Sequence, residues 1–150
     1  MLRIAIGTLL SLIATQALAD PCRAIPDKGP RPTWAKAGFV VTGTARYIID
    51  GDGLCIGSTG DPQGWVEIRL ADFYAPELKE SGGAVAKAAL TRLTGGRTIR
   101  CTAVKGDGGR AVSYDRLIAV CRIGKTSLAD LMRRDGQYEG GRGLRARGAP

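Results

Sequence analysis

Behind a leader rich in proline and glycine, hydrophobic and polar residues alternate along the chain. Over 39–49 the apolar residues share one parity: Val41, Ala45, Tyr47 and Ile49. Alternation with many β-branched residues predicts a half-buried strand. We predict two further strands at 54–57 and 65–73, with a tight Asp-Gly turn at 50–53 and a polar loop at 58–64.

A helical pattern follows Pro76. Ser81 is suited to be an N-cap, and Gly95-Gly96 is a stop signal. Between them an apolar residue recurs every four positions, which predicts a buried stripe: Val85, Ala89 and Leu93.

The last part of the chain returns to strand-like patterns. We predict strands at 97–104 and 111–123, the second interrupted near Tyr114-Asp115. A short helix is predicted to start at Thr126 or Ser127 and to end at Gly136. Its buried face is predicted to comprise Leu128, Leu131 and Met132.

Five strands with a helix between the third and the fourth are typical of the OB-fold. We therefore predict a mainly β protein with helices, an OB-fold five-stranded Greek-key barrel with two or three short helices. The predicted organisation is a signal peptide at 1–19, an irregular leader at 20–38, the barrel domain at 39–138 and a flexible basic tail at 139–150.

The first residues have the features of a secretory signal. Arg3 precedes an apolar run at 4–14, and Ala17-Leu18-Ala19 provides a small-x-small cleavage site. The run is about half as long as the ~20 residues of a spanning helix, which favours a cleaved signal over a permanent membrane anchor. We expect an exported protein, periplasmic or secreted and monomeric, with no stable membrane insertion after cleavage.

Export changes the interpretation of the four cysteines, because an oxidising compartment favours disulfides. Cys22, Cys55, Cys101 and Cys121 show no CxxC-like spacing for a metal, and three pairings are open. We favour Cys101–Cys121, since both lie in predicted strands that could be neighbours, which leaves Cys22–Cys55.

The composition limits both chemistry and partners. The 150-residue chain contains no histidine, which excludes Ser-His-Asp and Cys-His catalysis. It has 22 Lys and Arg against 14 Asp and Glu, a net charge of +8, of which one unit belongs to Arg3. A positive charge favours polyanions such as nucleic acid, but it serves solubility equally well.

Three motifs carry the candidate chemistry: IIDGDGLCI (48–56), IRLADFYAPE (68–77) and SYDRLIAV (113–120). In this order, over residues 40–138, the sequence resembles the staphylococcal nuclease-like (thermonuclease) family. The resemblance implies an OB barrel and metal-assisted hydrolysis of phosphodiester bonds in DNA or RNA, with calcium as the usual divalent metal.

The resemblance also implies catalytic roles. Arg69 and Arg116 correspond to the two catalytic arginines of the family, and Glu77 to the glutamate that orients or deprotonates the attacking water. Two guanidinium groups can bind phosphate oxygens as charge develops, and one carboxylate can take the proton.

For the metal, Asp52 corresponds to a ligating aspartate and Asp50 to an outer-shell carboxylate. Tyr74 stands where the family usually has a second ligating aspartate, and a phenol is a poorer ligand for a hard cation. Asp72 lies on the same side of an extended strand and could replace that ligand. Tyr74 and Tyr114 are candidate substrate-binding residues.

Other interpretations stay open. Taken singly, the two aspartates could only shape a turn, and Arg69 could lie on a solvated strand face. The whole barrel could bind nucleic acid or another polyanion without cutting it, or serve as an exported structural domain. Three tail residues could add phosphate contacts: Arg142, Arg145 and Arg147.

Overall fold

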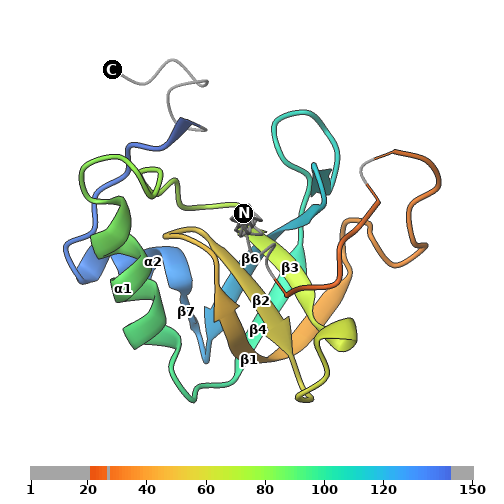
Figure 1. Ribbon diagram of the computed structural model, residues 1–150, viewed down its shortest axis with the longest axis horizontal. Coiled ribbons are helices and arrows are strands. Elements are labelled where there is room, and N and C mark those ends of the chain that lie inside the picture. Colours follow the sequence, from red (N-terminus) through yellow and green to blue (C-terminus); the bar gives the residue numbers. More distant parts are fainter. Residues whose placement is uncertain (1–20, 27, 143–150) are drawn as a thin grey trace, which may run out of the picture.

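The computed structural model describes residues 21–26 and 28–142, so the predicted signal peptide and the end of the predicted tail lie outside it. The elements follow the predicted order (Figure 1). The strands are β1 (Val40–Ile48), β2 (Gly53–Gly57), β3 (Val66–Leu70), β4 (Ile99–Ala103), β5 (Val112–Ser113), β6 (Arg116–Ile123) and β7 (Thr126–Ser127). The helices are α1 (Gly83–Thr94), α2 (Leu128–Arg134) and a short 3₁₀ turn, η1 (Pro62–Gly64).

The sheet closes on itself, which confirms the predicted OB-like barrel. β1 pairs antiparallel with β2 and β4, β2 with β3, and β4 with β6. The parallel pair β3–β6, with Ile68 opposite Leu117, completes a ring of five strands. Closure buries one apolar core and removes exposed strand edges from the ring.

The simple parity predicted for the first strand is wrong beyond its middle. The register between β1 and β2 shifts between Ala45 and Tyr47, as at a β-bulge. An extra residue on one strand shifts the alternation of inward and outward side chains in the residues that follow, and Tyr47 is therefore 41% exposed. The third strand is also shorter than predicted, because regular pairing ends at Leu70.

The predicted buried stripe of the first helix is rotated. Val85 is 62% exposed, whereas Ala86, Ala89 and Leu90 are buried. The predicted Ser81 cap is also wrong: the N-cap is Gly82, in a left-handed conformation and without a side-chain hydrogen bond. The later start brings a different set of residues to the core.

The start of the second helix agrees with the prediction. Ser127 is its N-cap, and its hydroxyl accepts a hydrogen bond of 3.0 Å from the amide of Asp130. Leu128 and Met132 are fully buried, and Leu131 packs against the core at its edge. The two helices lie side by side against one flank of the barrel (Figure 1).

Two disulfides stabilise the barrel and its leader, in the predicted pairing. Cys101 and Cys121 are direct cross-strand partners in β4 and β6. Cys22–Cys55 attaches the leader to β2, and the leader residue Ile25 is buried in the core. These bonds are compatible with the predicted export. Among the described residues, no helix has the length and apolar character that crossing a bilayer requires.

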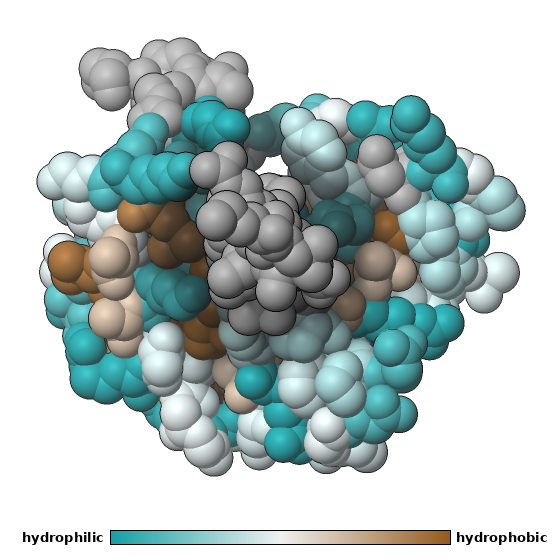
Figure 2. Space-filling view, in the orientation of Figure 1, coloured by the Kyte–Doolittle hydropathy of each residue, from teal (hydrophilic) through white to brown (hydrophobic). Residues whose placement is uncertain are grey.

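The surface differs between the two flanks. In Figure 2, drawn in the orientation of Figure 1, hydrophobic residues gather mainly on the side of the helices. The opposite side, which carries the leader and the β4–β5 loop, is largely hydrophilic.

Candidate active site

A cleft of about 540 Å³ lies at the rim of the barrel, where four separate segments meet. They are the β1–β2 turn, the end of β3 with the loop after it, the β5–β6 turn, and the end of the described chain. Its lining comprises Asp50, Asp52, Arg69, Ala75, Pro76, Glu77, Ser113, Tyr114, Arg116, Gly141 and Arg142.

The three residues predicted to be catalytic all line this cleft. Arg69 comes from β3, Glu77 from the loop before α1, and Arg116 from the start of β6. The parallel pairing of β3 with β6 explains how two arginines distant in sequence face one space. The cleft therefore offers two guanidinium groups and a carboxylate to a common ligand.

The Asp-Gly-Asp turn is held by its own side chain. Asp50 Oδ1 accepts a hydrogen bond of 3.0 Å from the amide of Asp52. A Cβ at Gly51 would lie 2.5 Å from the Cβ of Ala75 and 2.6 Å from that of Ala86. Only glycine lets the turn pack this closely, so Gly51 fixes the position of both carboxylates.

Asp52 is buried and paired with Arg69. Its Oδ2 lies 3.0 Å from Arg69 Nη1 and accepts a hydrogen bond of 2.8 Å from the amide of Ala75. Burial raises the pKa of Asp52 to about 7, although the Arg69 charge lowers it and the Ala75 amide opposes the rise. The buried carboxyl group of Asp52 therefore holds its proton to a higher pH than an exposed aspartate does.

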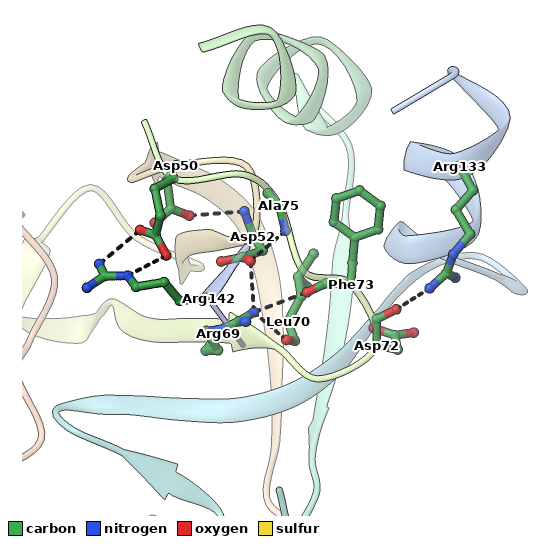
Figure 3. Close-up of polar contacts among 10 residues, drawn as sticks. Asp50, Asp52, Arg69, Leu70, Asp72, Phe73, Ala75, Arg133 and Arg142 are labelled. Carbon is green, nitrogen blue, oxygen red and sulfur yellow. Dashed lines mark hydrogen bonds and ion pairs between the residues drawn. The ribbon is translucent and has the colours of Figure 1, made fainter. Parts of the chain in front are cut away.

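The Arg69 guanidinium is anchored on several sides. Nη1 also donates to the carbonyl oxygens of Leu70 at 2.8 Å and Phe73 at 3.1 Å, and the guanidinium carbon lies 5.0 Å from the centre of the Tyr74 ring. Figure 3 shows Arg69 between Asp52 and these carbonyls. The side chain is preorganised, with little freedom to swing away.

Glu77 is bound by a residue from the far end of the described chain. Arg142 donates from Nε to Glu77 Oε1 at 2.9 Å and from Nη2 to Oε2 at 3.1 Å. This bidentate contact lowers the pKa of Glu77, against the smaller opposing effect of burial. Arg142 is itself largely exposed, so the contact can exchange with solvent or ligand.

Tyr114 forms an exposed wall of the cleft. Its φ of 57° is the only positive value at a non-glycine residue in the described ranges, and 72% of the residue is exposed. A tyrosine held in the left-handed region is unusual and is often found where function imposes the conformation. Its position beside the arginines suits a substrate contact.

The structure does not bring Asp72 to the cleft. Its carbonyl oxygen accepts a hydrogen bond of 2.5 Å from Arg133 of α2, and Figure 3 shows it well apart from Asp52. Burial raises the pKa of Asp72. Asp72 is not among the residues that line the cleft, because the chain turns after Leu70 instead of continuing as an extended strand, so its role as a replacement ligand stays a prediction.

The donor set does not fit the divalent cation that the resemblance implies. Oδ2 of Asp52 already accepts from Arg69 and Ala75, and Asp50 Oδ1 accepts from a backbone amide. Tyr74 offers a neutral phenol, and the described part of the chain contains no group of three or more acidic, cysteine or histidine ligands. Calcium prefers six to eight oxygen ligands with several charges. Calcium therefore stays a prediction of the resemblance.

Sequence reasoning missed how closely the end of the chain approaches the site. Arg142 was expected only as one of several tail residues, and Ser113 was not singled out. No local pattern predicts that a segment 65 residues away binds Glu77. The Gly140-Gly141 pair, which permits close approach to other backbone, is the sole signal present.

We find no family model and no curated protein sequence that matches this chain. The assignment of function therefore depends on the geometry of the cleft.

Proposed function

We propose that the protein is an exported, monomeric nuclease that hydrolyses phosphodiester bonds of DNA or RNA. The observation that supports this is the convergence of Arg69, Arg116 and Glu77 on one cleft at the rim of an OB-like barrel. Barrels of this class commonly bind oligonucleotides, which is an argument by analogy.

In the proposed reaction, the two arginines bind the non-bridging oxygens of the phosphate. The electrostatic attraction between the arginines and those oxygens strengthens as negative charge builds on the oxygens in the transition state. Glu77 takes a proton from a water molecule, the water oxygen bonds to phosphorus, and the bond to one ester oxygen breaks. The leaving oxygen takes a proton from solvent.

Arg142 must release Glu77, at least in part, before the carboxylate can act as a base. The exposure of Arg142 permits this, and a bound phosphate offers its guanidinium an alternative anionic partner. Asp52 has a positioning role here, because it holds Arg69 at 3.0 Å.

The test is to incubate the purified protein with single-stranded DNA and RNA in calcium, in other divalent ions and in chelator. We expect cleavage that Glu77→Gln lowers by about 10²- to 10⁴-fold. Asp130→Asn, at an exposed acid outside both clefts and with the same charge loss, is the matched control and keeps its activity. Absence of cleavage under every condition contradicts the proposal. Sensitivity to chelator separates the calcium expectation from chemistry by the chain alone.

A second candidate is a binding module that holds nucleic acid or another polyanion without cutting it. The pairing of both key carboxylates with arginines, Asp52 with Arg69 and Glu77 with Arg142, favours it. Salt-sensitive binding without cleavage in any metal is its expected signature.

A further inference from the structure

A second cleft, of about 570 Å³, lies beside the first. The two share Arg69, Ser113 and Tyr114, so that Tyr114 stands at their junction. The far wall of the second cleft consists of Arg31 from the leader and of Lys105 and Arg110 from the β4–β5 loop. The two clefts therefore adjoin at Tyr114.

The second cleft has an unbalanced positive charge. Four cationic residues line it, Arg31, Arg69, Lys105 and Arg110, against one acid, Asp107. A concave surface lined by one sign of charge concentrates ligands of the opposite sign.

The segments that carry these cations are anchored to the barrel. The Cys22–Cys55 bond and the buried Ile25 hold the leader that carries Arg31. Backbone hydrogen bonds of 2.9 Å from Gly106 to Arg110 and from Gly109 to Gly106 close the loop. Positioned cations lose less conformational entropy on binding than cations on free tails.

We propose that this second cleft binds phosphates of the same single-stranded polynucleotide whose scissile linkage occupies the first. The inference rests on the proposed function and extends it by naming the substrate class: a chain of several nucleotides with phosphates on either side of Tyr114. The exposed ring of Tyr114 lies between the candidate active site and the cationic second cleft, an arrangement that suits a single strand, since any base can stack on the ring.

The first experiment measures binding in chelator, by fluorescence anisotropy of a labelled thymidine dinucleotide and a labelled oligothymidylate dodecamer. Lys105→Gln/Arg110→Gln is compared with Lys125→Gln/Arg134→Gln, which removes the same charge from exposed positions outside both clefts. We expect the cleft variant to bind the dodecamer about tenfold more weakly than the control variant, and the dinucleotide equally well. The slope of log affinity against log salt falls by about 1.4 for two lost phosphate contacts.

The second experiment measures cleavage. The cleft variant is expected to have a KM for the dodecamer about tenfold higher than wild type, in line with its tenfold weaker binding, and an unchanged kcat. Its turnover of bis(p-nitrophenyl) phosphate, which has a single phosphodiester and no flanking phosphate, is expected to match wild type. Thermal unfolding checks that both double variants are folded.

Two results overturn the inference. One is that the cleft variant and the control variant bind the dodecamer equally. The other is that a heparin fragment or polyglutamate displaces the dodecamer as well as unlabelled oligothymidylate does, which indicates a general polyanion surface. A chain that cuts nothing, yet loses dodecamer affinity only in the cleft variant, contradicts the proposed function and leaves this site in place.

Discussion

The two neighbouring clefts share a wall but differ in how their charges are arranged. In the first, three acids face three arginines, and two of those acids are bound by arginines as Asp52–Arg69 and Glu77–Arg142. In the second, the cations outnumber the single acid. The first arrangement fixes individual groups at defined positions, as chemistry at one atom requires. The second provides attraction without defined partners, as binding of a charged chain requires.

The largest effect is expected from separating the leader from the barrel. Cys22→Ser/Cys55→Ser is expected to cost about 4 kcal/mol of unfolding free energy in the chain-entropy model, because the cysteines are 33 residues apart. It also frees Arg31 from the second cleft, so dodecamer affinity falls while bis(p-nitrophenyl) phosphate turnover does not. Urea unfolding and anisotropy measure the two effects.

Cys101→Ser/Cys121→Ser is the matched control for that experiment. It removes the cross-strand bond of β4 and β6, with a separation of 20 residues, and lowers stability by about 3 kcal/mol. It leaves the leader attached, so dodecamer affinity is expected to stay at the wild-type value. Arg31→Gln tests the leader cation in a chain that keeps both disulfides. Equal affinity in all these variants contradicts a role for the leader.

The next effect is on the buried pair of the first cleft. Arg69→Met leaves the Asp52 carboxylate buried without its cation, and we expect a loss of about 3 kcal/mol near pH 8. Burial already raises the pKa of Asp52 to about 7, above the ordinary 3.8, so the folded state holds a proton that the unfolded state releases. The contribution of Asp52 to stability therefore falls as pH rises from about 4 to 7, and removing Arg69 extends that window upward.

Urea unfolding in chelator from about pH 5 to pH 8 measures this effect. The difference between Arg69→Met and wild type is expected to be small at the acid end, where Asp52 is neutral, and to grow as pH rises. Asp52→Asn/Arg69→Met, which removes both charges, should recover most of the lost stability. A difference that does not depend on pH contradicts the electrostatic explanation.

Tyr74→Asp tests whether a carboxylate at position 74 supplies the second metal ligand that the resemblance implies. A third carboxylate next to the loop that binds Asp52 should tighten calcium binding by about tenfold or more. The measurement is the rise in melting temperature on adding calcium, since a ligand that binds only the folded state stabilises it. Tyr74→Phe is the control and should respond as wild type does. No difference between the variants means that a carboxylate at position 74 adds no calcium ligand.

The smallest effect concerns Arg142. Its bidentate contact is the main cause of the lowered pKa of Glu77, so Arg142→Ala should raise that pKa. The acid limb of the pH–rate profile then moves to higher pH, because Glu77 must be ionised to act as a base. Above that limb we expect a rate a few-fold higher, since a freer carboxylate with a higher pKa is a stronger base. Arg134→Ala removes a cation outside both clefts and should leave the profile unchanged.

Much of the barrel could be predicted from the sequence, because the signals that define strands are local. β-branched alternation located β1, and the turn residues after it located the start of β2. The rotation at Ala45 and Tyr47 could not be predicted, since a bulge depends on how two strands pair. The buried face of α1 was predicted only in part: Ala89 is buried as expected, but Ala86 and Leu90 accompany it in the core, whereas Val85 is exposed.

The site residues that belong to sequence motifs could be predicted, whereas the contacts that depend on tertiary structure could not. The register of β2 with β3 sets Arg69 opposite Gly53, next to Asp52, and this explains the ion pair. No local sequence pattern predicts that ion pair. The second cleft was harder still to predict from the sequence, because its cations Arg31, Lys105 and Arg110 lie in irregular segments without periodicity.

The segment before Arg142 has a practical consequence for anyone who works with this protein. The amides of Gly140 and Gly141 donate to the carbonyl oxygen of Tyr74 at 3.0 and 3.3 Å, and a Cβ at Gly141 would lie 2.1 Å from the carbonyl oxygen of Ala75. Backbone there is seated directly on the loop that carries Glu77. Any side chain at position 141 would press on that loop and shift the lining of the candidate cleft, so Gly141 is best left unchanged in variants designed for assays.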